Sequence, residues 1–414
     1  MRTAIIGGGA AGLMTAATIL AADPEADVFL LERNDGLGKK VIISGGGRCN
    51  VTTGILDVRT VLTKYPRGSK FLSSAMFTFP PEAVQAWFEA NGVPLKTEED
   101  LRVFPVSNDG RDIVAAFERL FEAPRMHVLL KTHVTGVERR PEGGFNVQIK
   151  GAEPLAADNV VLTTGGQAYR HTGSTGDGYA FAISLGHSLT PLAPSLNAFF
   201  TREHWPADVS GLSFPRAEFT ARRGKGISFT GPFLFTHKGV SGPAVFALSS
   251  LVAFERYDRD TPLEIAIDLF PDLTAEELRA LIAERTAENP AKLFQNVLAT
   301  IVPKSLSDIC MTEAALPGGT RADQMPKADV LRCVAWLKAI PLKVVGRGAG
   351  DEFVTAGGVP LTEVDPTTME SKICPGLYFA GEILDIDGFT GGFNLQASWA
   401  TGHLAGESIA NSAQ

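Results

Sequence analysis

The first residues whose types and spacing suggest chemistry lie near the N-terminus, where an apolar run meets Gly7, Gly9 and Gly12 in the spacing G-x-G-x-x-G. In such a unit the first glycine makes a tight turn, the second lets backbone approach a pyrophosphate, and the third lets a helix pack on a strand. Glu32 follows a second apolar run, twenty residues after Gly12, where a carboxylate can bind ribose hydroxyls. Together these residues predict a bound dinucleotide.

A second glycine-rich loop follows the basic pair Lys39 and Lys40 and a short apolar run over 41–43 that is expected to be a strand. The loop reads Ser44, Gly45, Gly46, Gly47, Arg48, Cys49, Asn50. Its glycines permit close approach of a ligand, the basic pair can neutralise phosphate, and the Asn50 amide can meet a polar ring edge. An ordinary glycine turn with a buried Cys49 explains the same letters equally well.

Two further strand ends carry polar or glycine residues. The apolar run 160–162 stops at Thr164 and Gly165, and the run 377–380 stops at Gly381 and Glu382. Ligands gather at the carboxyl ends of parallel strands. After Glu382, a glycine-rich loop leads to a helix expected to start near Asn394, whose N–H groups would stabilise the negative charge of a reduced flavin.

Tyr169, His171 and His237 stand in glycine-rich loops and are the candidates, with Asn50, for proton handling or substrate orientation. The alternative for each histidine is that it caps a turn or faces solvent. Asp177 or Thr175 is expected to cap the helix that follows their loop.

The elements that position these residues indicate an α/β fold. Residues 57–122 read mostly as helix and loop, 127–163 as strands with a β-meander, and 190–270 as a small β-barrel or sandwich, with a helix from Pro243. A capping box at Thr274 opens a run of helical patterns over 276–286, 292–301 and 328–339. The predicted layout is a Rossmann-like nucleotide domain (1–190 and 350–414), a β-rich substrate domain (191–271 and 340–349) and a helical insertion (272–339).

The composition limits the classes of partner that are expected for this protein. A net charge of -8 and a pI near 5.5 give no general attraction to nucleic acid, so none is expected. The four cysteines are widely spaced without C-x-x-C, so neither a disulfide nor a metal site is expected. No apolar run is long enough to cross a membrane. A cytoplasmic protein that acts on a small molecule is expected, and its oligomeric state stays open.

The sequence resembles the HI0933-like flavoproteins of bacteria, a family that includes aminoacetone oxidase and reductases of unsaturated bile-acid ketones. The matching strings are IIGGGAAGL, SGGGRCNVT, TGSTGDGY, FTHKGVSGPA, VTAGGVPLTEVDPTTMESK and GLYFAGEILDIDGFTGGFNLQ, which span nearly the whole chain. The resemblance implies a two-dinucleotide-fingerprint fold that holds FAD non-covalently. It also implies an inserted barrel-like domain with a small helical insertion.

The resemblance assigns cofactor contacts along FAD. The adenine, ribose and phosphate half would be held by Gly7, Gly9, Ala11, Gly12, Glu32, Arg33, Lys40 and the backbone of Val134. The loop containing Gly46, Arg48, Cys49 and Asn50 would lie toward the flavin ring. Gly381, Glu382 and Asp387 would meet the ribityl chain, and Gly392, Asn394 and Leu395 the pyrimidine edge.

Three functions fit these observations. The first is oxidation of a small amine, with dioxygen reduced to peroxide. The second is NAD(P)H-dependent reduction of an activated C=C bond, with the nicotinamide visiting the substrate pocket because no second G-x-G-x-x-G with a following acid is present. The third is a non-catalytic FAD-binding redox sensor. A flavoprotein that modifies tRNA is a fourth, weaker reading that the acidic balance disfavours.

Overall fold

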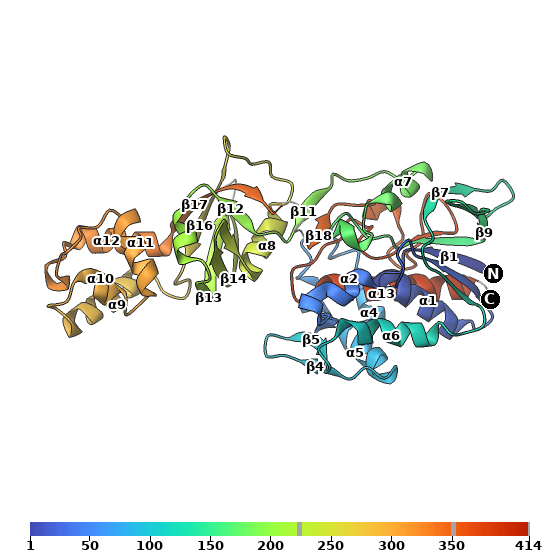
Figure 1. Cartoon of the computed structure of the whole chain (residues 1–414), viewed down its shortest axis with the longest axis horizontal. Helices are drawn as coiled ribbons and strands as arrows, with labels where there is room; N and C mark the ends of the chain where they lie inside the picture. The colour runs from blue at the N-terminus through green and yellow to red at the C-terminus, as the bar shows by residue number, and fades with distance from the viewer. Residues whose placement is uncertain (222–225, 349–352, 413–414) are drawn as a thin grey trace. The chain divides into compact units, whose positions relative to one another are not determined.

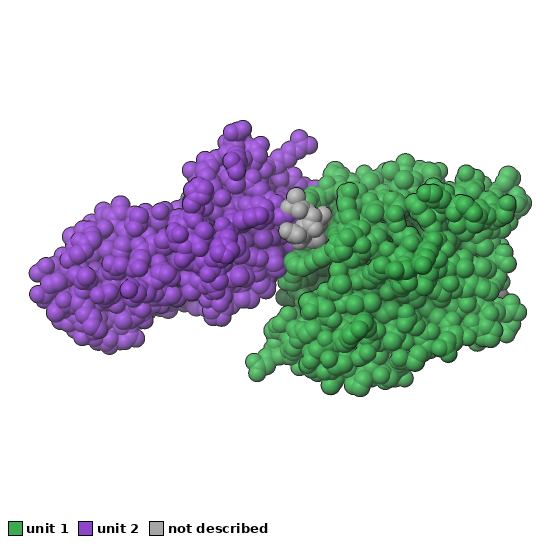
Figure 2. Space-filling view, in the orientation of Figure 1, with its two compact units in different colours: residues 1–195, 350–414 green, residues 196–349 purple. Residues whose placement is uncertain are grey.

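The computed structural model describes residues 1–221, 226–348 and 353–412. The chain divides into two compact units, one of residues 1–195 with 350–414 and one of residues 196–349 (Figure 2). The chain thus leaves the first unit once and returns to it.

Unit 1 is organised around a five-stranded sheet in which all neighbouring strands run parallel. In spatial order the strands are β19 (Leu377–Phe379), β10 (Asn159–Leu162), β1 (Arg2–Ile6), β2 (Asp27–Leu31) and β6 (Met126–Leu129). β10 is buried along its whole length, which explains its unbroken apolar run. The predicted α/β class is confirmed, and the carboxyl ends of β19, β10, β1 and β2 lie side by side.

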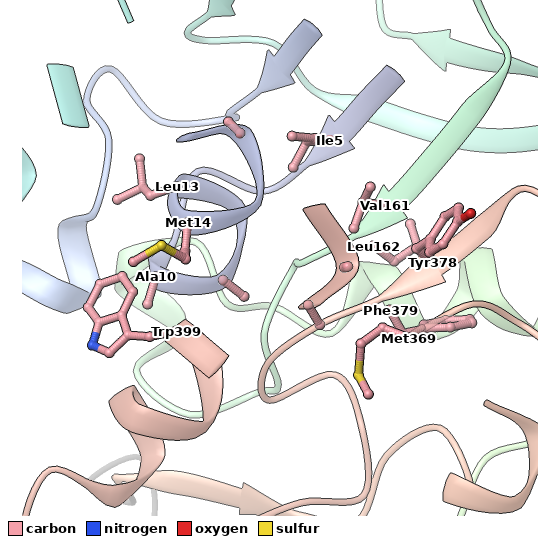
Figure 3. Close-up of a cluster of buried hydrophobic side chains, with 14 of the residues drawn as sticks. Ile5, Ala10, Leu13, Met14, Val161, Leu162, Met369, Tyr378, Phe379 and Trp399 are labelled. Carbon is pink, nitrogen blue, oxygen red and sulfur yellow. The ribbon is translucent and has the colours of Figure 1, made fainter. Parts of the chain in front are cut away.

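Two long helices, α1 (Ala10–Ala22) and α13 (Phe393–Ser412), pack against each other beside this sheet (Figure 1). They approach closely, since a Cβ added at Gly402 would lie 2.5 Å from the Ala11 carbonyl oxygen. Figure 3 shows Ile5 of β1 and Leu13 and Met14 of α1 in the core that these elements share. The core joins the first and last elements of the chain.

The other helices of unit 1 are short: α2 (Lys39–Ile43), α3 (Val58–Leu62), α4 (Ser73–Thr78), α5 (Pro81–Ala90), α6 (Gly110–Leu120) and α7 (Asp177–Ser184). The prediction of a strand over 41–43 was wrong. The run is helical, and of its three apolar residues only Val41 is buried. A three-residue apolar run is too short for periodicity to separate a strand from a helix turn.

Unit 1 has three small antiparallel sheets. They are β3 (Thr52–Thr53), β5 (Arg102–Pro105) and β4 (Leu95–Thr97); then the predicted meander of β7 (Val134–Arg139), β8 (Phe145–Ile149) and β9 (Leu155–Ala157); and β11 (Ala193–Ser195) with β18 (Val354–Ala356). Residues 57–122 are mostly helix and loop, as predicted, and the two short strands β4 and β5 within them were not predicted. These strands are too short to show alternation.

Unit 2 contains a closed six-stranded antiparallel barrel, so the choice between barrel and sandwich is resolved. Its strands, in barrel order, are β12 (Phe199–Thr201), β15 (Gly239–Ser241), β14 (Ile227–Thr236), β13 (Ser213–Ala221), β16 (Leu263–Asp268) and β17 (Ile340–Arg347). Helix α8 (Pro243–Leu251) begins at the predicted proline. Phe199, Phe219, Phe233 and Phe235 are buried in the core of this unit.

The helical insertion of unit 2 comprises α9 (Ala275–Glu288), α10 (Phe294–Leu298), α11 (Lys304–Glu313) and α12 (Lys327–Lys338). The capping box of Thr274 with Glu277 is present, as predicted. Helix α11 was not predicted. None of the helices in the described part of the chain is both long enough and apolar enough to cross a lipid bilayer.

Candidate functional site

The predicted phosphate loop joins β1 to α1. A Cβ added at Gly7 would lie 2.6 Å from the Thr163 carbonyl oxygen, and one at Gly12 only 2.0 Å from that of Gly7. At Gly9, the N-cap of α1, an added Cβ would meet no atom within 4 Å. The protein therefore packs against the first and third glycines and leaves the second open, as a cradle for pyrophosphate requires.

Glu32 is held at the end of β2 by three N–H donors. The Gly8 amide donates to its Oε2 at 2.8 Å, and the Asn34 amide and side chain donate to its Oε1 at 2.8 and 2.7 Å. The carboxylate is 9% exposed. These bonds fix it against the phosphate loop, and its contact with ribose stays a prediction.

Arg33 explains why the capping prediction was wrong. Helix α7 has Gly176 as its N-cap, and no side chain of the described residues caps it. Arg33 Nη1 instead donates to Asp177 Oδ2 and to Thr175 Oγ1, each at 2.8 Å. His133 Nε2 lies 3.8 Å from the same Asp177 oxygen, just before Val134 opens β7. The residues predicted for the adenine half are thus brought together at one end of the site.

Lys40 and Glu382 come from opposite ends of the chain and form an ion pair, with Nζ 2.6 Å from Oε2. The Thr355 amide donates to the other carboxylate oxygen at 2.8 Å. A Cβ added at Gly381 would lie 2.9 Å from that of Ala11, so the end of β19 sits against the start of α1. The second fingerprint therefore meets the first.

Thr164 and Gly165 follow β10 in the same region. Thr164 Oγ1 is buried, and no atom of the described residues forms a hydrogen bond with it. Gly165 has a φ of +71°. A buried hydroxyl without a partner is unusual and marks a place where a further polar group would be accommodated.

The glycine loop predicted to face the flavin ring turns through three left-handed residues, Gly45, Gly46 and Gly47. A Cβ added at Gly46 or Gly47 would meet no atom within 4 Å. The loop therefore presents exposed backbone, which suits close approach of a flat ring.

Arg48 and Cys49 of this loop point elsewhere. Arg48 Nη1 donates to Glu98 Oε1 at 2.7 Å, and its guanidinium lies 3.8 Å from the centre of the Phe104 ring. Cys49 is fully buried, and burial raises the pKa of its thiol to about 12. Because the Arg48 side chain is engaged with Glu98 and Phe104 and the Cys49 thiol is buried, a contribution of these two residues to FAD binding would come from their backbone.

The last residue of the glycine loop, Asn50, lies beside the segment that leads into α13, which contains Gly392 and Asn394. With its amide oriented to satisfy both partners, Asn50 donates to the Thr52 carbonyl at 3.0 Å and accepts from the Gly392 amide at 2.9 Å. Asn394 donates to and accepts from the Gly388 backbone, each at 2.8 Å. Both amides fix the start of α13, where Leu395 is half-buried.

Asp387 is fully buried, and its carboxylate is paired with Arg67 and accepts from Ser195 Oγ at 2.8 Å. Sequence reasoning missed Arg67. The two partners are 320 residues apart, and Arg67 stands in no motif. Its loop position beside Gly68 was the sole hint.

The proton-handling candidates fall in different places. Tyr169 has a φ of +55°, which is rare for a bulky residue, and its ring centre lies 6.0 Å from Lys40 Nζ and 5.7 Å from the His171 ring. His171 is exposed. His237 is exposed between β14 and β15 and belongs to unit 2. Tyr169 is therefore the candidate that the structure brings to the Lys40–Glu382 pair.

The residues present fit FAD. Gly9 with its open side follows β1, and Thr164 with its partnerless hydroxyl follows β10, the neighbouring parallel strand. Dinucleotides bind at the carboxyl ends of such strands, on a glycine-rich turn of this kind. Among the described residues, no group of three or more His, Cys, Asp or Glu side chains is arranged to hold a metal ion.

Solved structures share this fold. A 3-ketosteroid delta1-dehydrogenase from Sterolibacterium denitrificans aligns over 99% of both chains with a TM-score of 0.52 and 13% identity. A mutant quinol fumarate reductase from E. coli aligns over 100% of this chain and 70% of its own, with a TM-score of 0.50 and 15% identity. At these identities the likeness concerns the fold alone.

Sequence relatives cover the whole chain. A 3-dehydro-bile acid delta(4,6)-reductase from Clostridium scindens is 30% identical over 99% of both proteins. Ribosomal RNA dihydrouridine synthases are 29% identical in Haemophilus influenzae, over 98% of this chain and 97% of the relative, and 28% in Escherichia coli, over 96% and 95%. Residues 1–408 match the family description HI0933-like protein Rossmann domain. The chain therefore belongs to the HI0933-like family and has the Rossmann-like fold of FAD-dependent oxidoreductases.

Proposed function

We propose that this FAD-dependent oxidoreductase reduces a C=C bond conjugated to a carbonyl group, with NAD(P)H as the electron source. One observation carries the proposal: the names of the three relatives describe the same bond change. Reduction of a 3-dehydro-bile acid at Δ4 and Δ6 and conversion of uridine to dihydrouridine both saturate a C=C bond that a carbonyl polarises. The reaction named is therefore the same, although the substrates of these relatives differ.

The site supports this reaction. The sequence has one G-x-G-x-x-G with a following acid, so a nicotinamide would have to reach the same ring face as the substrate. The backbone at Gly46 and Gly47 is open, since a Cβ added at either residue would meet no atom within 4 Å. FAD, when bound, would supply the hydride chemistry, with NAD(P)H as the source of the electrons and the β-carbon of the substrate as the hydride acceptor.

The chain has to supply a proton to the α-carbon, and we assign this role to Tyr169. A phenol stays neutral at physiological pH and donates a proton readily when a cation stands beside it. The Lys40 ammonium, held by Glu382, is such a cation. The left-handed backbone of Tyr169 is strain of the kind that clusters at functional sites. His171, edge-on to the ring, orients it.

We further propose that FAD is bound without a covalent link. A cysteinyl link would need a reactive thiol near the ring, and the Cys49 thiol is buried with its pKa raised to about 12. Acid precipitation of the yellow protein should release all flavin into the supernatant.

The substrate we propose is a small unsaturated carbonyl compound. The net charge of -8 disfavours a large phosphate backbone as partner. The same reaction on a uracil ring of ribosomal RNA is the second candidate, because two of the relatives carry that name. The place of action that we expect is the cytoplasm.

The test is an anaerobic two-step experiment. NADH and NADPH are first mixed with the loaded enzyme, and flavin bleaching is followed. The reduced enzyme is then mixed with cyclohexenone, a 3-keto-4,6-diene bile acid, or a ribosomal RNA transcript. Reoxidation of the flavin by an enone supports the proposal. If RNA alone reoxidises the flavin, the proposed substrate changes from a small enone to ribosomal RNA. Tyr169→Phe should slow the second step by at least about 100-fold and leave the first unchanged.

Two outcomes would overturn the proposal. If neither nicotinamide bleaches the flavin, whereas aminoacetone or another small amine in air yields peroxide catalytically, the enzyme is the amine oxidase that the family resemblance also suggested. If no donor and no acceptor turns over, and a partner protein binds only one redox state, the redox-sensor reading replaces catalysis.

A further inference from the structure

A short segment, residues 64–68, is hydrogen-bonded to the loop that leads into α13. The Tyr65 hydroxyl donates to the Phe393 carbonyl at 2.6 Å, and the Phe389 amide donates to the Lys64 carbonyl at 2.9 Å. Arg67 pairs with Asp387 through both backbone and side chain. We call this segment the 64–68 clamp. Nothing in the sequence fingerprints predicts it.

The charged pair is the centre of the clamp. The Asp387 side chain is 0% exposed and that of Arg67 17%. A buried carboxylate is stable only when it is paired and hydrogen-bonded, and removal of one partner leaves an uncompensated charge. Ser195 supplies one hydrogen bond to Asp387, and Arg67 supplies the opposite charge.

The loop held by the clamp fixes the position at which α13 starts. Asn394, in its first turn, bonds both backbone groups of Gly388, the residue after Asp387. Phe393, held by Tyr65, is its first residue. The position of this helix end, and of the partial positive charge it carries, therefore depends on the clamp.

We propose that Arg67 is a positioning residue that sets the reduction potential of the bound flavin. The inference rests on the proposed FAD site and does not depend on the substrate. When Arg67 is neutralised, the Asp387 carboxylate becomes a buried negative charge close to the start of α13, the helix end that we predicted at the pyrimidine edge of the flavin. Reduction adds negative charge at that edge, so the reduced state is disfavoured and the potential falls.

The experiment uses full-length, FAD-loaded protein and measures the two-electron midpoint potential by equilibration with reference dyes. Arg67→Gln should lower the potential by about 30 mV, which is tenfold in the equilibrium constant. Arg67→Lys should stay close to the parent, and Asp387→Asn should raise the potential because it removes a negative charge and keeps the positive charge of Arg67. Arg111→Gln is the matched control, since Arg111 is an exposed arginine of α6 paired with Asp109.

The double variant Arg67→Gln with Asp387→Asn separates charge from folding. It restores neutrality without restoring the clamp, so its potential should return at least halfway to the parent value. If Arg67 has a purely structural role, the potential of the double variant should not return toward the parent value. Alternatively, the potential should be unchanged in every variant while the melting temperature drops. Either result overturns the inference. If Arg67→Gln does not retain FAD, the shift expected for Asp387→Asn still tests the sign: an unchanged or lowered potential there overturns the inference. Because no substrate is used, failure of enone reduction leaves this test intact.

Discussion

The Thr355 amide donates to Glu382 Oε1 at 2.8 Å, and Thr355 lies on β18, the strand by which the chain re-enters unit 1. Its antiparallel partner β11, by which the chain leaves unit 1, ends at Ser195, whose hydroxyl donates to Asp387. Both strands of the connection are thus bonded to an acid of the closing motif. Both acids, Glu382 and Asp387, were predicted to meet the ribityl chain of FAD.

Gly9 and Gly12 should respond differently to substitution, although both belong to the fingerprint. A side chain at Gly9 meets open space, so Gly9→Leu should change the free energy of unfolding of the apoprotein by no more than about 0.5 kcal/mol while preventing FAD binding. Gly12→Ala drives a methyl into the Gly7 carbonyl and should cost at least about 2 kcal/mol. Urea unfolding and the flavin-to-protein absorbance ratio measure the two effects. A yellow Gly9→Leu protein would remove the phosphate assignment.

Lys40→Gln should weaken FAD binding by about tenfold, which corresponds to about 1.4 kcal/mol. The substitution leaves the Glu382 carboxylate without its cation and adds repulsion toward the phosphates. Lys39→Gln is the matched control, because the neighbouring Lys39 pairs with the exposed Asp35. Titration of each apoprotein with FAD, followed by quenching of flavin fluorescence, gives the two affinities. Equal affinities would show that Lys40 only joins two segments.

The sequence was sufficient where an element carries its own signal. The glycine spacing of residues 7–12 and the unbroken apolar runs ending at Leu31, Leu162 and Phe379 placed the strands whose ends meet. The capping box at Thr274 located a helix start to the residue. These signals are local, because each depends on residues within one turn or one strand.

The parts that could not be predicted depend on contacts distant in sequence. Arg33 draws Asp177 away from capping, and Arg67 meets Asp387 across 320 residues. The hydrogen bonds of the Asn394 side chain with Gly388 were not predicted either, and the contact of Asn394 with the flavin edge stays a prediction. A side chain chooses between a ligand and a neighbouring loop only once the chain is folded, so residue type alone cannot decide.

The native thiols should be unreactive. Cys49, Cys310, Cys333 and Cys374 are all buried, and burial raises the pKa of Cys49 to about 12 and the pKa of Cys374 above its ordinary value. A thiol reagent such as DTNB at pH 8 should label none of the four within minutes and all four in guanidinium. Cys49→Ala should keep the flavin spectrum. Rapid labelling of one thiol with loss of flavin would show that the ring loop opens.

Stability should fall on mild acidification because of two histidines, the buried His187 and the partly buried His403. His187 Nδ1 donates to the Glu363 carboxylate at 2.9 Å, and its Nε2 lies 2.8 Å from Ser371 Oγ. His403 contacts Thr18 and Glu407. Burial lowers the pKa of both imidazoles below the ordinary value of 6.5, so the unfolded state takes up protons first as the pH drops. The free energy of unfolding should therefore be constant from about pH 8 to 7 and decline below about 6.5.

His187→Gln should remove part of this decline and His187→Gln with His403→Gln nearly all of it, whereas His204→Gln, at an exposed position of unit 2, should leave it unchanged. Glu363 acts in a separate window, since its pKa is lowered from about 4.5 and its contribution is lost only at lower pH. Urea unfolding of the apoproteins between pH 5.5 and 8 measures the slopes. A decline that persists in the double variant would assign the acid sensitivity to carboxylates and away from the imidazoles.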